Sequence, residues 1–321
     1  MKRLVRAVLL MIITLLVAAG SVPAQSQCTP GVSFWKLLDS VRIGYRDGRL
    51  NIDKLYAVCL PMPSKRSSSS FPYDPDGGAK LATLVKTADG KLLNTYVWYS
   101  QNVAGLWELD NYKVIGGLES IKPLAPGNYQ LEFVLEDEPF YKFPFSVTEL
   151  KNDDPYQAAG SRYFIEGPWN EYGNIFFQRN DPTSVLRFTT WFQDKSGHNS
   201  KDSMPSDIKL IRVRDRKVIG TASDPLRLEP QWRQADFLFT TPGGDSGSYL
   251  KAGDVLGEDG RYNVRVEVNG ALYGEYPFTV KAGRIQLQGK QIRESTDSQQ
   301  YIVDYLSGGR YTSWWIQREL K

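Results

Sequence analysis

Residues that commonly carry chemistry are scarce in this chain of 321 residues. It contains one histidine, His198, and two cysteines, Cys28 and Cys59. Zinc sites usually take several histidine or cysteine ligands, and general acid–base catalysis most often uses histidine. These counts leave little room for either kind of site, so carboxylates are the main remaining groups for catalysis.

One short motif has the residues of a serine nucleophile. Gly244-Asp245-Ser246-Gly247 resembles the nucleophile motif of chymotrypsin-like serine proteases. That family needs histidine, aspartate and serine in this order, with a further glycine after the motif. Here Ser248 stands in place of that glycine, and the only histidine, His198, lies upstream in a polar segment. We interpret the motif as a polar turn.

Two acidic segments offer the oxygen ligands that calcium prefers. The candidate ligands are Asp74 and Asp76 in one segment, and Asp153 and Asp154 in the other. Neither segment has the length or spacing of a known calcium loop. Ordinary acidic turns explain both, so we predict no metal site and no cofactor.

Two aromatic residues lie among polar groups in the segment from Glu166 to Gly173. They are Trp169 and Tyr172, and sugar-binding β-sandwiches use aromatic faces that are flanked by amides and carboxylates. Both are therefore candidate glycan-binding residues. A tryptophan that covers a domain junction explains the same residues.

The C-terminal segment concentrates aromatic residues. Residues 299–306 and 311–320 flank Ser307-Gly308-Gly309-Arg310, a pattern that predicts a β-hairpin. Successive side chains of a strand point to opposite faces, so at least one of the adjacent Trp314 and Trp315 needs cover. The second domain or a partner protein can supply that cover. In the second case the candidate partner-binding residues are Tyr301, Tyr305, Tyr311, Trp314 and Trp315.

An internal repeat predicts the architecture. Residues 127–147 and 260–280 align without a gap, and both copies alternate apolar and polar residues with period two. Each copy reads as a hairpin of two strands. Pro144 and Pro277 occupy equivalent positions in the second strands, and proline favours an edge because it cannot donate to a ladder. A further match, residues 84–93 with 210–219, extends the repeat upstream.

The segments before the repeated tyrosines resemble the tyrosine corner of immunoglobulin-like domains. In that fold a tyrosine opens the penultimate strand after a tight corner, and Tyr129 and Tyr262 follow LAPGN and LGEDGR in the matching place. The cysteine pair that joins the two sheets of antibody domains is absent. The resemblance extends over both copies of the repeat and implies a fold: tandem immunoglobulin-like β-sandwiches, as in exported bacterial proteins.

These patterns predict an all-β chain of two tandem immunoglobulin-like antiparallel β-sandwiches with a C-terminal hairpin extension. The predicted parts are a signal peptide (1–24), a first domain (25–149), a linker (150–161), a second domain (162–282) and the extension (283–321). One short helix is expected between Ser33 and Val41, where the apolar residues have helical spacing.

The first 24 residues have the three parts of a signal peptide. A basic stretch is followed by an apolar stretch from Ala7 to Ala19 and by small residues at Val22-Pro23-Ala24. No later segment approaches the roughly 20 apolar residues that a membrane-spanning helix needs. We therefore expect bacterial export to the periplasm, the exterior or the cell surface, and no integral membrane segment after cleavage.

Net charge gives no support for a nucleic-acid partner. The chain has 39 basic and 36 acidic residues, and residues 1–24 hold three of the basic ones and none of the acidic ones. After cleavage 36 of each remain, so the mature chain is neutral and lacks the positive field that attracts nucleic acid or an anionic membrane.

Together these features predict an exported, non-enzymatic module for protein interaction, such as an accessory subunit or surface spacer that binds another envelope or extracellular protein. The alternative is a carbohydrate-binding module. A third possibility is an enzyme that uses carboxylates.

A disulfide between Cys28 and Cys59 follows from the predicted export, because both lie in the mature chain and oxidising compartments favour such bonds. Closing a loop of about 30 residues would stabilise the fold by roughly 3–4 kcal/mol. Mass spectrometry of the non-reduced exported protein should find one covalently linked peptide pair containing both cysteines. Two free thiols in freshly isolated protein would contradict this prediction.

Overall fold

The computed structural model describes residues 31–58, 81–103, 106–151, 160–178, 181–196, 203–244, 247–286, 288 and 311–319. Strands make up most of this part, which confirms the all-β class. The helices are short: α2 (Phe34–Ser40), α3 (Ala252–Leu256) and the 3-10 turns η1 (Leu118–Ser120) and η2 (Pro168–Asn170). None of these helices is long and apolar enough to cross a membrane.

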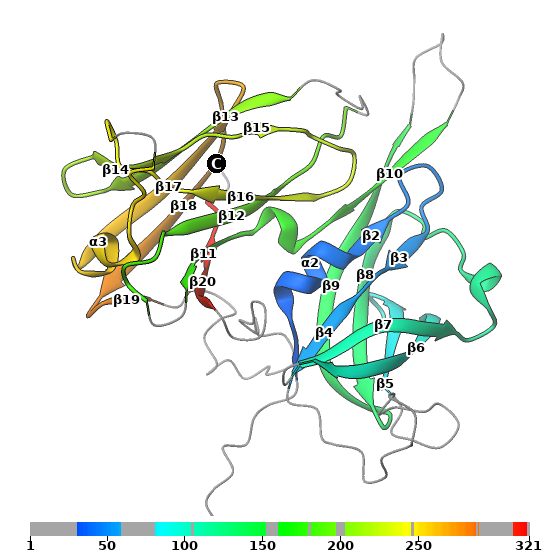
Figure 1. Ribbon diagram of the computed structural model, residues 1–321. Helices are drawn as coiled ribbons and strands as arrows, with labels where there is room; N and C mark the ends of the chain where they lie inside the picture. Colours follow the sequence, from blue (N-terminus) through cyan, green and yellow to red (C-terminus); the bar gives the residue numbers. More distant parts are fainter. Residues whose placement is uncertain are drawn as a thin grey trace, which may run out of the picture.

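The first unit is an eight-stranded antiparallel sheet that curls around its core (Figure 1). In spatial order its strands are β1 (Gly31–Val32), β4 (Leu55–Val58), β7 (Leu106–Val114), β6 (Leu92–Val103), β5 (Leu81–Thr87), β8 (Gly127–Leu135), β9 (Glu138–Lys151) and β10 (Ser161–Glu166). Helix α2 and the hairpin of β2 (Val41–Ile43) and β3 (Leu50–Ile52) share one hydrophobic core with this sheet. One continuous sheet therefore replaces the pair of facing sheets expected here.

The second unit is a β-sandwich. One sheet contains β16 (Arg233–Leu238), β12 (Arg187–Phe192), β11 (Tyr172–Gln178) and β20 (Tyr311–Gln317). The other contains β14 (Lys217–Ala222), β13 (Met204–Arg212), β17 (Gly260–Val268), β18 (Ala271–Lys281) and β19 (Arg284–Ile285), with β15 (Pro225–Leu226) paired to β13. Side chains from both sheets, such as Phe188 and Val264, fill one core between them.

The predicted repeat has the same backbone geometry in both units. Strands β8 and β17 begin at the aligned residues Gly127 and Gly260, and β9 and β18 begin at the next aligned pair, Glu138 and Ala271. The pairing of each hairpin shifts at the equivalent position, after Phe133 in one and after Val266 in the other. Both two-residue turns have positive φ at their central residues, 53° and 67° at Glu136-Asp137 and 50° and 74° at Asn269-Gly270. Hairpin turns of this kind match the right-handed twist of the strands that they join.

The repeated tyrosines make equivalent contacts. The hydroxyl of Tyr129 donates to the carbonyl of Ala125 at 2.6 Å, and that of Tyr262 donates to the carbonyl of Glu258 at 2.8 Å. Each ring stacks on the phenylalanine opposite it in the next strand. Burial raises the pKa of both phenols, so each remains a neutral donor at physiological pH. The two tyrosines therefore fix the segments before β8 and β17 in the same way.

The repeated prolines lie where no further strand pairs. Pro144 is opposite Gln130 of β8, and β10 pairs with β9 only from Ser146 onward. Pro277 is opposite Asn263 of β17, and β19 pairs with β18 only at Val280 and Lys281. Over the described strands, each proline thus occupies an unpaired edge, as expected.

The predicted domain boundaries need correction. Ser161 pairs with Lys151, and Arg162 pairs with Leu150, so residues 150–161 connect neighbouring strands of one sheet instead of linking two domains. The strand over 161–166 belongs to the first unit. The C-terminal strand β20 pairs with β11 over its whole length and completes a sheet of the second unit. The expected hairpin partner, residues 299–306, lies outside the described residues.

The two units share aromatic packing at their junction. Phe34 contacts Tyr172 and Trp315 at ring-centroid distances of 5.9 and 4.8 Å. Trp35 contacts Trp191 at 5.4 Å, and Trp191 stacks on Trp315 at 5.7 Å. Helix α2 of the first unit therefore packs against the outer face of the four-stranded sheet of the second.

Replacing Trp315 by alanine should destabilise the whole chain, because its ring is 1% exposed and contacts α2 as well as Trp191. We expect Trp315→Ala to lower the free energy of unfolding by roughly 3–5 kcal/mol, measured by denaturant titration. Gln317→Ala, in the same strand but exposed, is the control and should change it by less than about 0.5 kcal/mol. Equal effects of the two substitutions would rule out a shared core at Trp315.

Candidate functional site

A cleft of about 520 Å³ opens where the two units meet. Helix α2 forms one wall, and the other is formed by residues 229–232 together with Arg233 and Gln234, the first two residues of β16. Its lining residues are Trp35, Lys36, Leu38, Asp39, Arg42, Trp191, Glu229, Gln231, Trp232, Arg233 and Gln234. The volume and the position between two units are both typical of ligand sites. We call it the junction cleft.

Three indole rings line the junction cleft, and each is held by a different contact. Trp191 is fully buried and stacks on Trp315. Trp35 is half-buried and packs edge-on against Trp191. The ring nitrogen of Trp232 donates to the carbonyl of Ile165 at 2.7 Å, which fixes the half-buried ring between the units. The cleft therefore has rigid aromatic walls.

The charged side chains of the junction cleft are all close to an opposite charge. Lys36 lies 3.4 Å from Asp39, Arg233 pairs with Glu229, and Arg42 lies 4.0 Å from Asp53. Arg42 also donates to the carbonyl of Asp39 at 3.1 Å. The cleft thus presents many polar atoms without an unpaired cation among its described lining residues.

A cluster behind the cleft holds Trp191 in place. The hydroxyl of Tyr273 donates to the carbonyl of Trp191 at 2.5 Å. The guanidinium of Arg318 lies 4.2 Å from the centre of the Tyr273 ring and also bonds Asn170. Burial raises the pKa of Tyr273, so its hydroxyl stays protonated as a donor. The C-terminal strand therefore supports the floor of the cleft.

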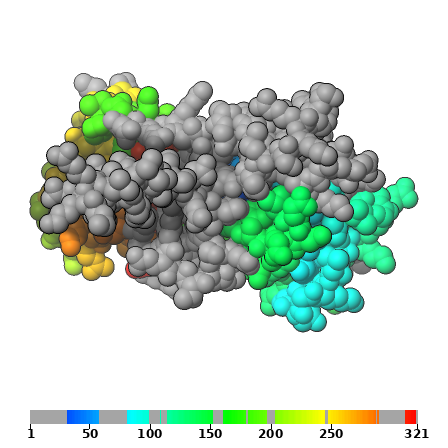
Figure 2. Space-filling model, turned by 90° about the horizontal axis from the view of Figure 1, so that it is seen from below, coloured from blue at the N-terminus to red at the C-terminus, as the bar shows by residue number. Residues whose placement is uncertain are grey.

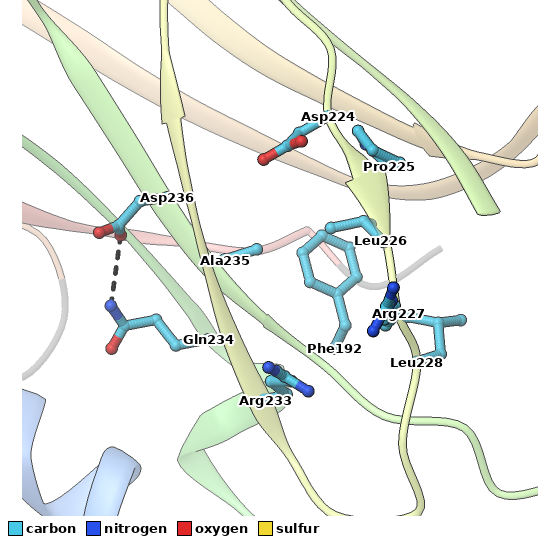
Figure 3. Close-up of a pocket in the computed structure, with 10 residues that line it drawn as sticks. All are labelled: Phe192, Asp224, Pro225, Leu226, Arg227, Leu228, Arg233, Gln234, Ala235 and Asp236. Atoms are coloured by element: carbon cyan, nitrogen blue, oxygen red, sulfur yellow. Dashed lines mark hydrogen bonds between the residues drawn. The ribbon is translucent and has the colours of Figure 1, made fainter. Parts of the chain in front are cut away.

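A second cleft, of about 330 Å³, lies on the other side of β16 (Figure 3). Residues 224–228 form its opposite wall, and Phe192 lies between the two walls. Gln234 and Asp236 point away from Phe192, toward the side where α2 lies, and are joined by a hydrogen bond of 3.3 Å (Figure 3). Arg233 and Gln234 line both clefts, so the start of β16 separates them.

Several buried polar atoms near the junction cleft have no hydrogen-bond partner among the described residues. They are the ring nitrogens of Trp191 and Trp315 and both side-chain atoms of Asn174. Asn174 pairs in register with Thr189 on one side and with Trp315 on the other. An unpaired buried polar group costs roughly 1–3 kcal/mol. Apolar side chains at these positions would therefore give a more stable junction.

A separate surface of the first unit exposes four large aliphatic side chains. Leu92, Leu93, Ile115 and Leu118 are between 36% and 65% exposed. Leu92 and Leu93 line a groove of about 430 Å³ against residues 120–125. The amide of Ile115 donates to the carbonyl of Thr95 at 3.0 Å, which places Ile115 beside β6. We call these four residues the apolar patch. In Figures 1 and 2 the segment around η1, which follows β7, lies at the end of the first unit that faces away from the second.

The residues predicted to bind a glycan do not reach the surface. Trp169 is 1% exposed and Tyr172 is 3% exposed. The ring nitrogen of Trp169 donates to the carbonyl of Leu38 at 2.6 Å, so this tryptophan covers the junction. That prediction is corrected, because neither ring face is open to a sugar.

Two of the aromatic residues predicted to bind a partner, Trp314 and Trp315, belong to the chain's own core. Trp314 stacks on Phe177 inside the sandwich, Trp315 packs at the junction, and Tyr311 contacts Phe176. Trp314 and Trp315 are 9% and 1% exposed. The chain itself therefore covers both faces of β20, which corrects the prediction of a docking surface for these residues. Tyr301 and Tyr305 lie outside the described residues.

The remaining predicted residues also lie outside the described part of the chain. They are Cys28, Cys59, Asp74, Asp76, Asp153, Asp154, His198, Asp245 and Ser246. In the ranges that the structure does describe, no group of three or more histidine, cysteine, aspartate or glutamate side chains could hold a metal ion.

The sequence offered no signal that joins Trp35, Trp191 and Trp232. They come from separate segments of the chain, and Trp232 lies among polar residues in its own segment. Only the packing of α2 on the four-stranded sheet brings them together. Comparison with protein-family models, with curated proteins and with solved structures gave no match to this chain.

Asn174 offers a direct test of the unpaired groups at the junction. Asn174→Leu should raise the free energy of unfolding by about 1–2 kcal/mol, since it removes a buried amide without a partner and keeps a similar volume. Thr189→Val, at the facing position, should lower it by about 1 kcal/mol because the hydroxyl of Thr189 bonds Asp236. Denaturant titration measures both. A loss of stability in Asn174→Leu would show that the amide is satisfied by water or by a ligand.

Proposed function

We propose that this protein is an exported bacterial, non-enzymatic interaction module: an accessory subunit or surface spacer that binds another envelope or extracellular protein. The N-terminal basic, apolar and small-residue segments support export. The junction supports the role of a spacer, because shared aromatic packing fixes the two units relative to each other.

An immunoglobulin-like origin of the units fits their strand order. In the second unit β11, β12 and β16 are neighbours in one sheet, and β14, β13, β17 and β18 follow one another in the other. Immunoglobulin-like sandwiches place strands A, B and E together and strands C′, C, F and G together. Tyr262, at the start of β17, then has the corner position of strand F. The first unit keeps the order β6, β5, β8, β9 around Tyr129.

The apolar patch is the observation that carries the interaction function. Two of its aliphatic side chains, Leu92 and Leu93, line one groove, and Ile115 lies beside the same strand, β6. An exposed apolar surface that is surrounded by polar residues is typical of protein interaction sites. Lys91, Asn94 and Lys122 line the same groove and supply such a rim. A second function, carbohydrate binding, is favoured by the indole rings of the junction cleft.

The patch can be tested with paired variants of the full exported chain. Leu93→Glu with Leu118→Glu places two charges on the patch, and Val213→Glu with Leu272→Glu places two on comparably exposed aliphatic positions of the second unit. Affinity purification from the native envelope should recover a partner with the wild type and with the second pair. Recovery with the first pair should fall at least tenfold, while circular dichroism shows an unchanged fold.

Two results would contradict this proposal. One is equal recovery of the same proteins by all three forms, which would place the contact elsewhere. The other is self-association: if light scattering shows a dimer that only the Leu93→Glu, Leu118→Glu pair disrupts, the patch joins two copies of this chain. An accessory role toward a different protein would then be wrong.

A further inference from the structure

The junction cleft combines two kinds of surface that one ligand class needs together. Half-buried indole rings, Trp35 and Trp232, lie on its two walls, and Trp35 packs against the fully buried Trp191. Carboxylates, amides and basic groups surround the rings. An aromatic face stacks on the C–H face of a sugar ring, and its polar neighbours bond the hydroxyl groups.

The charges of the cleft favour a neutral ligand. Its three basic side chains each lie within 4.0 Å of a carboxylate. Binding of a phosphate, a nucleic acid or an acidic polysaccharide uses cations that a negative ligand can neutralise. Here those cations already have partners, and a negative ligand would face Asp39 and Glu229 as well. Neutral hydroxyl groups can bond both members of each pair without separating them.

Trp191 belongs to the lining of the cleft, but its ring is closed to a ligand. The side chain is 0% exposed, its ring nitrogen is buried, and Trp35 and Trp315 pack against the ring. The carbonyl of Trp191 is bonded by the hydroxyl of Tyr273. The indole rings that a ligand can reach are therefore those of the half-buried Trp35 and Trp232.

We propose that the junction cleft binds a neutral oligosaccharide. The proposal rests on the second function given above, carbohydrate binding, and names its site and ligand class; it is independent of the apolar patch, which is a different surface. The volume of about 520 Å³ falls within the usual range for ligand sites, roughly 300–1,000 Å³. The site is rigid because the aromatic packing between the units holds both walls, so little ordering is needed on binding.

A peptide is the main rival ligand. Peptides that bind β-proteins often add a strand to an open edge, and main-chain hydrogen bonds then supply most of the affinity. Residues 229–232 and helix α2 are not strands, and the edge strand β16 reaches the junction cleft only with its first two residues, Arg233 and Gln234. So short an edge offers few main-chain hydrogen bonds to an extended peptide, which favours a sugar.

The test uses the full exported chain and a panel of neutral hexasaccharides built from glucose, xylose, mannose or N-acetylglucosamine. Titration is followed by tryptophan fluorescence and by calorimetry, with hexagalacturonate as the acidic probe. We expect saturable binding of at least one neutral probe, together with a change in indole emission, and at least tenfold weaker binding of hexagalacturonate.

Matched variants then locate the site. Asp39→Ala with Gln231→Ala removes two polar groups of the junction cleft, and neither residue belongs to the hydrophobic core. This pair of substitutions should lower the affinity for the neutral probe at least tenfold, which corresponds to about 1.4 kcal/mol. Asp224→Ala with Arg227→Ala, which changes only the neighbouring cleft, is the control and should leave the affinity within twofold. Trp232→Phe, which keeps a ring but removes its bond to Ile165, provides a second variant with a smaller loss.

Three outcomes would overturn the proposal. The first is that no neutral probe binds at millimolar concentration. The second is tighter binding of the acidic probe, which would mean that the paired cations are available to a charged ligand. The third is selection, from a displayed peptide library, of sequences whose binding is lost in the Asp39→Ala, Gln231→Ala pair, since the cleft would then be a peptide site. The outcome with the apolar-patch variants does not bear on any of these results.

Discussion

The contact on which the rest of the structure depends is the packing of α2 against the indoles of Trp191 and Trp315. These rings come from three distant parts of the chain, and each aromatic pair contributes roughly 0.5–1.5 kcal/mol beyond the area it buries. The contact requires both ends of the described chain, because α2 begins at Phe34 and β20 ends at Gln317. The junction therefore joins elements from both ends of the described chain, and two of its rings, Trp35 and Trp191, also line the cleft.

The two copies of the repeat show how one motif can serve different surroundings. Both copies keep the same hairpin, the same shift in pairing and the same tyrosine contact. In the second unit a four-stranded sheet covers the motif, whereas in the first unit the sheet continues and curls over a helix and a hairpin. Local geometry is thus set by the repeated residues, and the cover is set by whatever strand or helix reaches the exposed apolar face.

This difference explains what could be predicted from the sequence. Period-two alternation, turn residues and the internal repeat predicted the hairpins around Tyr129 and Tyr262, since those features depend on neighbours in the chain. Strand β10 was assigned to the wrong unit, because its pairing with β9 depends on which edge is open in the folded sheet. For a similar reason the sequence left two interpretations open for Trp169 and Trp315, burial within the chain or contact with a ligand or partner. Alternation indicates that a ring needs cover, but it does not identify the element that provides it.

Three residues at the junction carry buried polar atoms that packing alone does not require. Leucine or phenylalanine at positions 174, 191 and 315 would bury the same face without a polar atom to satisfy, and each unpaired group costs roughly 1–3 kcal/mol. A chain is expected to depart from such local rules mainly where another requirement applies. Asn174, Trp191 and Trp315 meet on the outer face of one sheet, and Trp191 also lines the cleft. All of these atoms are buried, and of the three residues only Trp191 lines the cleft, so the unpaired groups are a cost within the junction itself and do not identify a ligand.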